Sequence, residues 1–232
     1  MADISVRYRI ALEDGPTEEF ELTLDDRTLE LGHAETDALP SWTDLGFQQC
    51  PHCPLRPDDV PRCPAAVRLV PLVQRFARVL SYEKATIEVR TAERTVIHDT
   101  SAQQAVSSLM GLIMAVSGCP HTAFFRPMAR FHLPGASLEE TTYRAASMHM
   151  LAQYWVRRAG GEPDLDFTAL VRRYKDVQQV NRAFVRRLHA AAQADSTINA
   201  LVVLDAWALS LPWEIAESLE NLRPLFAPYL EG

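Results

Sequence analysis

Four cysteines are the residues with the clearest chemical signature in this chain, and each one is followed directly by proline. Cys50 and Cys53 are two residues apart, Cys63 follows soon after them, and Cys119 stands far along the chain. A two-residue spacing lets two sulfurs face one ion, and proline stiffens the backbone beside each sulfur. The pattern therefore predicts one metal centre held by all four cysteines.

Two kinds of centre fit this pattern. Zinc would take four thiolates, or three with His52 or His121 replacing one sulfur, and such a filled site would be structural. An iron–sulfur cluster fits equally well because cysteine followed by proline is familiar from ferredoxin-type sites, and it would indicate redox sensing or electron transfer. Spacing does not separate these soft-ligand metals, and four ordinary buried cysteines are the alternative to both.

The segment from Cys50 to Cys53 also matches the dithiol motif of thiol–disulfide oxidoreductases. In that class the motif opens a long helix, with the first thiol at the helix N-terminus. Three prolines follow the motif at once here, at Pro54, Pro57 and Pro61, and they exclude such a helix. We therefore reject this class of enzyme.

Residues 117–135 form a second candidate site, since they connect two predicted helices without any periodicity. Long connections of this kind are often functional. Arg126 and Arg130 could bind an anion there, and His121 is close enough in sequence to donate a hydrogen bond to the sulfur of Cys119. The alternative function is thus an enzyme with its anion-binding active site in this connection and with His121 and His132 as acid–base groups. Hydrogen bonding of the arginines to loop carbonyls is the competing interpretation.

Composition indicates an ordinary globular protein, with 47% hydrophobic and 23% charged residues. The net charge of −7 is uneven, because residues 1–60 carry 14 acids and 4 bases while the remainder carries 16 acids and 19 bases. An acidic first quarter argues against nucleic-acid binding through that region. No signal peptide and no apolar run of membrane-spanning length is found. We therefore expect a cytoplasmic protein whose cysteines stay reduced.

Eight basic residues between positions 157 and 187 are interpreted as a solvated helix surface, with an acidic protein partner as the alternative. They are Arg157, Arg158, Arg172, Arg173, Lys175, Arg182, Arg186 and Arg187. The sequence specifies neither the partner nor an oligomeric state.

Apolar periodicity predicts an α+β fold that is predominantly helical. Alternating residues indicate an N-terminal β-hairpin at 4–12 and 18–24, and a second short hairpin at 85–90 and 95–99. These hairpins are expected to pack on a bundle of about six helices, at 64–80, 101–116, 137–159, 164–194, 195–209 and 213–222. Ser101 with Gln104, and Ser137 with Glu140, have the spacing of capping boxes.

Between residues 32 and 64 six prolines exclude regular helices and central strands. A metal ion is therefore expected to hold this segment in place. The predicted organisation is an acidic hairpin and proline-rich cysteine segment, residues 1–63, followed by a mainly helical body, residues 64–232, integrated into one domain.

Several short motifs resemble an uncharacterised bacterial family, a domain of unknown function, over nearly the whole chain. The resemblance implies that the cysteines and the connection at 117–135 belong to one site, and it implies no activity. The residues that carry it are Trp42-Thr43-Asp44-Leu45, Cys50-Pro51-His52-Cys53-Pro54-Leu55, Cys63-Pro64-Ala65, Ser81-Tyr82-Glu83, Ser117-Gly118-Cys119-Pro120-His121, Arg126-Pro127-Met128 and Phe131-His132-Leu133-Pro134.

Overall fold

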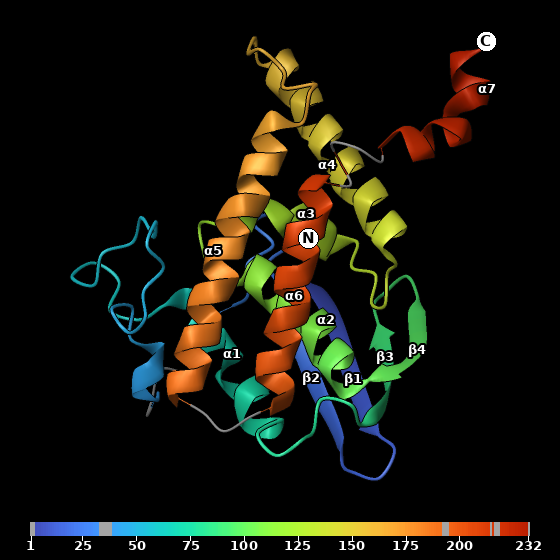
Figure 1. The fold of residues 1–232 in the computed structure, drawn as a ribbon. Helices are drawn as coiled ribbons and strands as arrows, with labels where there is room; N and C mark the ends of the chain where they lie inside the picture. Colours follow the sequence, from blue (N-terminus) through green and yellow to red (C-terminus); the bar gives the residue numbers. More distant parts are fainter. Residues whose placement is uncertain (1–2, 33–38, 192–194, 214, 216–218, 232) are drawn as a thin grey trace.

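Helices predominate over a single antiparallel sheet in the computed structural model (Figure 1), which describes residues 3–32, 39–191, 195–213, 215 and 219–231. Within these residues there are four strands and seven α-helices, joined by short 3-10 segments. The predicted α+β class is confirmed. Buried side chains from both sides of residue 63 share one hydrophobic core, and the division into two segments at that residue stays a prediction.

The sheet consists of two hairpins that pair through their inner strands. Strands β1 (Ile4–Leu12) and β2 (Thr17–Leu24) form the first hairpin, and β3 (Lys84–Arg90) and β4 (Thr95–Ser101) form the second. The strand order is β2-β1-β3-β4, and all pairs are antiparallel. On β1, β2 and β3 buried and exposed residues largely alternate, which is the pattern of a sheet with one face against the core.

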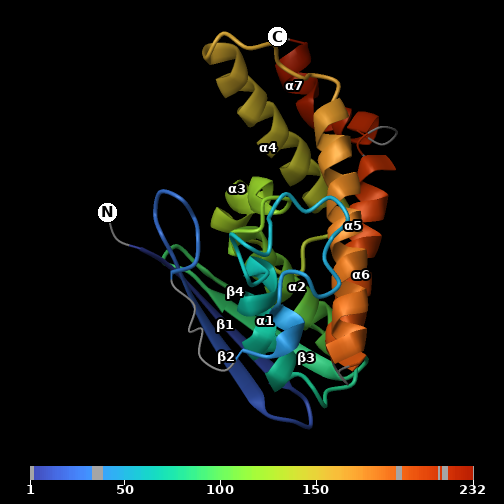
Figure 2. The same ribbon diagram turned by 90° about the vertical axis from the view of Figure 1, so that its left-hand side faces the viewer.

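The helices cover one face of the sheet in two layers, as Figure 2 shows. Helices α1 (Pro64–Arg75) and α2 (Ala102–Val116) lie against the sheet, and α5 (Thr168–Ala191) and α6 (Asp195–Trp213) pack outside them. Helix α2 is buried on nearly every side because it lies between the sheet and the outer pair. Because of this central position, α2 can contribute side chains to the wall of a cavity between the inner and outer helices.

Helix α4 (Leu138–Arg158) extends away from the sheet, beside the first half of α5 (Figure 1). The last described elements are the 3-10 segment η4 (Leu219–Phe226) and α7 (Ala227–Leu230), and Phe226 stacks on Tyr143 of α4. Residues 214 and 216–218 of the helix predicted at 213–222 lie outside the described residues, and the described remainder from Leu219 is 3-10.

The two predicted capping boxes have different outcomes. Ser137 and Glu140 exchange both hydrogen bonds, so the box that opens α4 is confirmed. Ser101 makes no capping hydrogen bond, because it is the last residue of β4. The first amides of α2 instead donate to the carbonyls of Glu83 and Ser81, at 2.7 and 3.0 Å. Backbone carbonyls of the preceding loop thus accept from these amides in place of the Ser101 side chain.

Two further predictions, about where helices begin and end, are wrong. Helix α1 ends at Arg75 rather than near residue 80. The connection at 117–135 is not structureless, since it contains η2 (Ala123–Phe125) and α3 (Arg126–Arg130). Both are single turns, too short for a periodic pattern to reveal.

Arg187 fixes the proline-rich segment, a role that was expected of a metal ion. Its guanidinium donates to the carbonyl oxygens of Trp42, Asp44 and Leu45 from within α5. The side chain is buried, at 2% exposure, so its assignment to a solvated surface is wrong. Burial lowers the pKa of Arg187, an effect that Cys63 and Cys50 oppose. The segment is therefore fixed by a buried cation bound to backbone carbonyls.

Gly135 and Gly160 provide a matched pair for measuring how tightly the chain packs against β4. Both have positive φ, +69° and +84°, where an L side chain is strained. A Cβ at Gly135 would lie 2.6 Å from the His98 ring, whereas nothing lies within 4 Å of one at Gly160. We expect Gly160→Ala to cost about 1 kcal/mol of unfolding free energy and Gly135→Ala clearly more. Equal losses in chemical denaturation would show that the His98 contact is unimportant.

Candidate ligand-binding cavity

The four cysteines lie where the proline-rich segment meets α1 and the end of α2. All are free thiols; Cys63 and Cys119 are buried, and Cys50 and Cys53 pack against the edge of the core. Burial, with smaller contributions from Cys63, Cys119 and Cys53, raises the pKa of Cys50 to about 12. Burial also raises the pKa of Cys63 and Cys119. These three thiols are therefore neutral at physiological pH.

The predicted four-cysteine metal centre is wrong. Within the described residues no group of three or more His, Cys, Asp or Glu side chains is arranged to hold a metal ion. The thiols are close enough to affect one another electrostatically but do not form a cage. The redox-sensing or electron-transfer role that was inferred from such a centre is therefore not supported.

His52 and His121 pack against each other beside the cysteines. Their ring centroids are 3.9 Å apart, and the His121 Nε2 contacts the carbonyl oxygen of His52 at 3.0 Å. Burial lowers the pKa of His52, and His121 lowers it further, while Asp176 opposes both effects. The pair therefore joins the proline-rich segment to the connection after α2.

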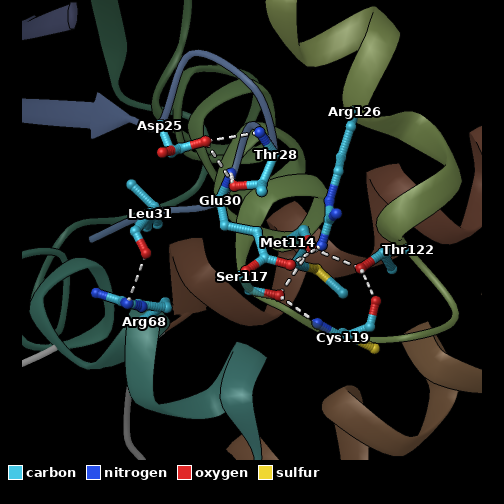
Figure 3. A network of polar contacts seen from close by, with 10 residues as sticks. All are labelled: Asp25, Thr28, Glu30, Leu31, Arg68, Met114, Ser117, Cys119, Thr122 and Arg126. Carbon is cyan, nitrogen blue, oxygen red and sulfur yellow. Dashed lines mark hydrogen bonds and ion pairs between the residues drawn. The ribbon is translucent and has the colours of Figure 1, made fainter. Parts of the chain in front are cut away.

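A hydrogen-bond network fixes the chain where it leaves α2 (Figure 3). Ser117 Oγ donates to the carbonyl oxygen of Met114 at 2.8 Å and accepts from the amide of Cys119 at 3.2 Å. Thr122 Oγ1 donates to the same Met114 carbonyl. Gly118, with φ of +90°, makes the turn that this network closes. The network thereby fixes the position of the chain that leads into α3.

The two arginines predicted to bind an anion each have a carboxylate partner. Arg126 pairs with Glu30, which follows the first hairpin, as Figure 3 shows. Arg130 pairs with Glu93 at 3.0 Å, in the turn of the second hairpin. Both arginines thus attach α3 to the sheet, and an added anion would have to displace a glutamate from either one.

His132 is partly buried and contacts strand β1 and helix α2. Its Nε2 is hydrogen-bonded to the hydroxyl of Tyr8 on β1 and lies 3.5 Å from Ser108 Oγ on α2. The Tyr8 and Ser108 hydroxyls are themselves 3.1 Å apart. Burial, with a smaller effect of Arg144, lowers the pKa of His132 to about 3. The imidazole is therefore neutral at physiological pH and joins three elements.

Beside His132 the structure contains a cavity of about 230 Å³. Its walls come from α2, α5 and α6, and residues 122–144 close one side. Most of the wall is apolar, including Leu112, Phe125, Met128, Val177, Leu204 and Trp207. An apolar cavity of about 150 Å³ binds benzene. This one therefore has room for a ligand of roughly ten non-hydrogen atoms.

Two buried hydrogen-bond donors line this cavity without acceptors among the described residues. The hydroxyl of Tyr174 and the side-chain amide nitrogen of Asn181 are buried with no hydrogen-bond partner among the described residues. Both residues line the cavity from α5. Burial raises the pKa of Tyr174, and the nearby charge of Arg144 lowers it. A buried donor without an acceptor costs about 1–3 kcal/mol, so these groups suit a ligand that brings acceptors.

Arg144 gives the cavity a positive charge. It comes from α4, lines the cavity, and uses one Nη to donate to the carbonyl oxygens of Met128 and Phe131, at 3.1 and 2.7 Å. Burial lowers its pKa, with Glu140 as the largest opposing charge. No carboxylate of the described residues forms an ion pair with Arg144, unlike Arg126 and Arg130. Its charge therefore faces the cavity without a carboxylate partner among the described residues.

Sequence reasoning did not find Arg144, Tyr174 or Asn181 as site residues. One signal was present: the core-facing positions of α5 follow the spacing of a buried helix face, at Leu170, Tyr174, Val177, Asn181, Phe184 and Leu188. A polar amide in such a row is unexpected unless it has a partner. The amide of Asn181 in this buried row is therefore the sequence signal of the site.

Comparison with known proteins identifies a family but no activity. The family described as a domain of unknown function (DUF6901) matches residues 6–227, so the chain belongs to this family. The resemblance to an uncharacterised domain family is thereby confirmed. No curated protein and no solved structure matches the chain. No described helix is both long enough and apolar enough to cross a bilayer.

Proposed function

We propose that this protein binds a small amphipathic carboxylic acid in the cavity between α2, α5 and α6. The observation that carries the proposal is the presence of three side-chain donors, Tyr174, Asn181 and Arg144, in the wall of one mostly apolar cavity. A few placed polar groups in a mostly apolar cavity are typical of small-molecule sites. The polar donors and the apolar surface of the wall together define the ligand class.

The charge of Arg144 favours a carboxylate over a neutral acceptor. A guanidinium offers five N–H donors in a plane that matches the two oxygens of a carboxylate. The hydrogen bonds of Arg144 to Met128 and Phe131 use one of its two terminal nitrogens. Tyr174 and Asn181 line the same cavity and supply donors without bringing a negative charge. A bound carboxylate would accept from Arg144 and from Tyr174, whose pKa the nearby charge of Arg144 lowers.

The size of the cavity limits the remainder of the ligand. A volume of about 230 Å³ fits roughly ten non-hydrogen atoms, judged against the cavity that binds benzene. Phenylacetate and octanoate both have this size and place an apolar body behind a carboxylate. They are suitable probes for the proposed ligand class.

Calorimetric titration with acids and their amides tests the proposal. We expect phenylacetate or octanoate to bind at least about tenfold more tightly than phenylacetamide or octanamide, because a hydrogen bond to a charged group contributes about 1.5–3 kcal/mol. In Arg144→Met the acid and the amide should bind alike. Arg172→Met, on the exposed side of α5, is the matched control and should keep the preference. The proposal is wrong if the wild-type protein binds neither acid.

A further inference from the structure

The outer face of α4 carries a row of large apolar side chains that the described chain leaves largely exposed. Tyr143, Met150, Leu151, Tyr154 and Trp155 have exposed fractions between 39% and 61%. Their spacing of three, four and seven residues places them along one side of the helix. An exposed apolar row of this length is unusual for a monomer and marks an interaction surface.

Charges at the two ends of this row indicate what covers it. Glu140 stands at the N-terminal end of α4 and Arg158 at the C-terminal end. Their spacing of eighteen residues is a whole number of helical turns, so both share the side of the helix that carries Leu151. The row is therefore acidic at one end and basic at the other.

We propose that this face of α4 pairs antiparallel with the same face of a second copy of the chain. A two-fold axis on the exposed side of α4, at the level of residue 149 along the helix, would put Glu140 of each copy beside Arg158 of the other. It would also put Tyr143 opposite Trp155, and Ser147 opposite Leu151. A two-fold interface requires one surface to complement itself, and the charge distribution of α4 meets that requirement.

The position of α4 in the fold leaves room for this pairing. The helix extends beyond the sheet, and its last two turns are exposed on most sides (Figure 1). Within the described residues, the C-terminal segment reaches the row only at its edge, where Phe226 stacks on Tyr143 with ring centroids 6.4 Å apart. The rest of the face, including Leu151 and Trp155, is available to a partner helix.

Sedimentation velocity of the full chain over a range of micromolar concentrations tests the pairing. We expect a species of twice the 26.0 kDa chain mass. Leu151→Glu with Trp155→Glu should convert it to the monomer, because two charges would enter an apolar seam. Ile97→Glu, an equally exposed residue on β4 at 66%, should leave the dimer intact. Circular dichroism should show unchanged helix content in each variant, since all three sites are on the surface.

Disulfide trapping distinguishes the antiparallel arrangement from others. Met150→Cys lies near the proposed axis and should give a covalent dimer under mild oxidation, whereas Arg158→Cys at the helix end should not. Trapping through Arg158→Cys would overturn the proposal. It is also overturned by a wild-type protein that stays monomeric, including one that instead sediments with anionic phospholipid vesicles, or by a dimer that survives both glutamates.

Discussion

Lowering the pH from 7 to 4 should cost the wild-type protein about 3 kcal/mol more unfolding free energy than it costs a His132→Gln variant. His132 has a folded-state pKa of about 3, set mainly by burial, against an ordinary value of 6.5. The folded state therefore resists protonation while the unfolded chain accepts a proton. Stability is present above pH 6.5 and is lost as the pH falls from 6.5 toward 3.

Urea denaturation at a series of pH values measures this effect directly. Glutamine can keep a polar atom near the Tyr8 hydroxyl but does not titrate in this range, so the variant should show a shallower loss of stability below pH 6.5. Its stability at pH 7 will be lower, and for that reason only the slopes are compared. Parallel pH profiles would mean that His132 is accessible to protons in the folded protein.

Replacing Tyr174 by phenylalanine should stabilise the protein and weaken ligand binding. The hydroxyl is buried and lacks a hydrogen-bond partner among the described residues, so its removal should raise the unfolding free energy by about 1 kcal/mol. The same change removes a donor to a bound carboxylate, and the affinity for phenylacetate or octanoate should fall about tenfold. Opposite effects on stability and binding are characteristic of a residue kept for a ligand.

Tyr229→Phe is the matched control for this experiment. Tyr229 is 89% exposed near the C-terminus, so removal of its hydroxyl should change neither the unfolding free energy nor the affinity. Thermal unfolding and calorimetry of the same preparations give both readouts. A loss of stability in Tyr174→Phe would contradict the account, because it would show that the hydroxyl already has a partner within the protein.

Local patterns in the sequence predicted most of the fold. The alternation in residues 4–12 and 85–90 produced strands because one face of the sheet packs on the core, and the Ser137–Glu140 pair began a helix as its spacing requires. The Ser101 box failed because carbonyls from Ser81 and Glu83 reached the first amides of α2. Such competition comes from residues distant in the sequence, and no local pattern contains it.

The candidate site was less predictable because its residues come together only in the tertiary structure. The spacing of Cys50 and Cys53 describes two sulfurs, but completion of a metal cage depends on where Cys63 and Cys119 are placed by α1 and α2. The cavity combines Arg144 of α4 with Tyr174 and Asn181 of α5. Glu140 stands four residues before Arg144 on α4, and this spacing gives no sign that the two side chains form no ion pair.

The central claim is that a carboxylic acid occupies the cavity, and its location can be measured by nuclear magnetic resonance. Isotope-edited spectra of the protein with phenylacetate would report which protons lie beside the bound ring. The account predicts nuclear Overhauser effects from the phenylacetate ring to the methyl groups of Val177 and Leu204, which line the apolar wall. Effects to residues outside this wall, or none at saturating phenylacetate, would contradict it.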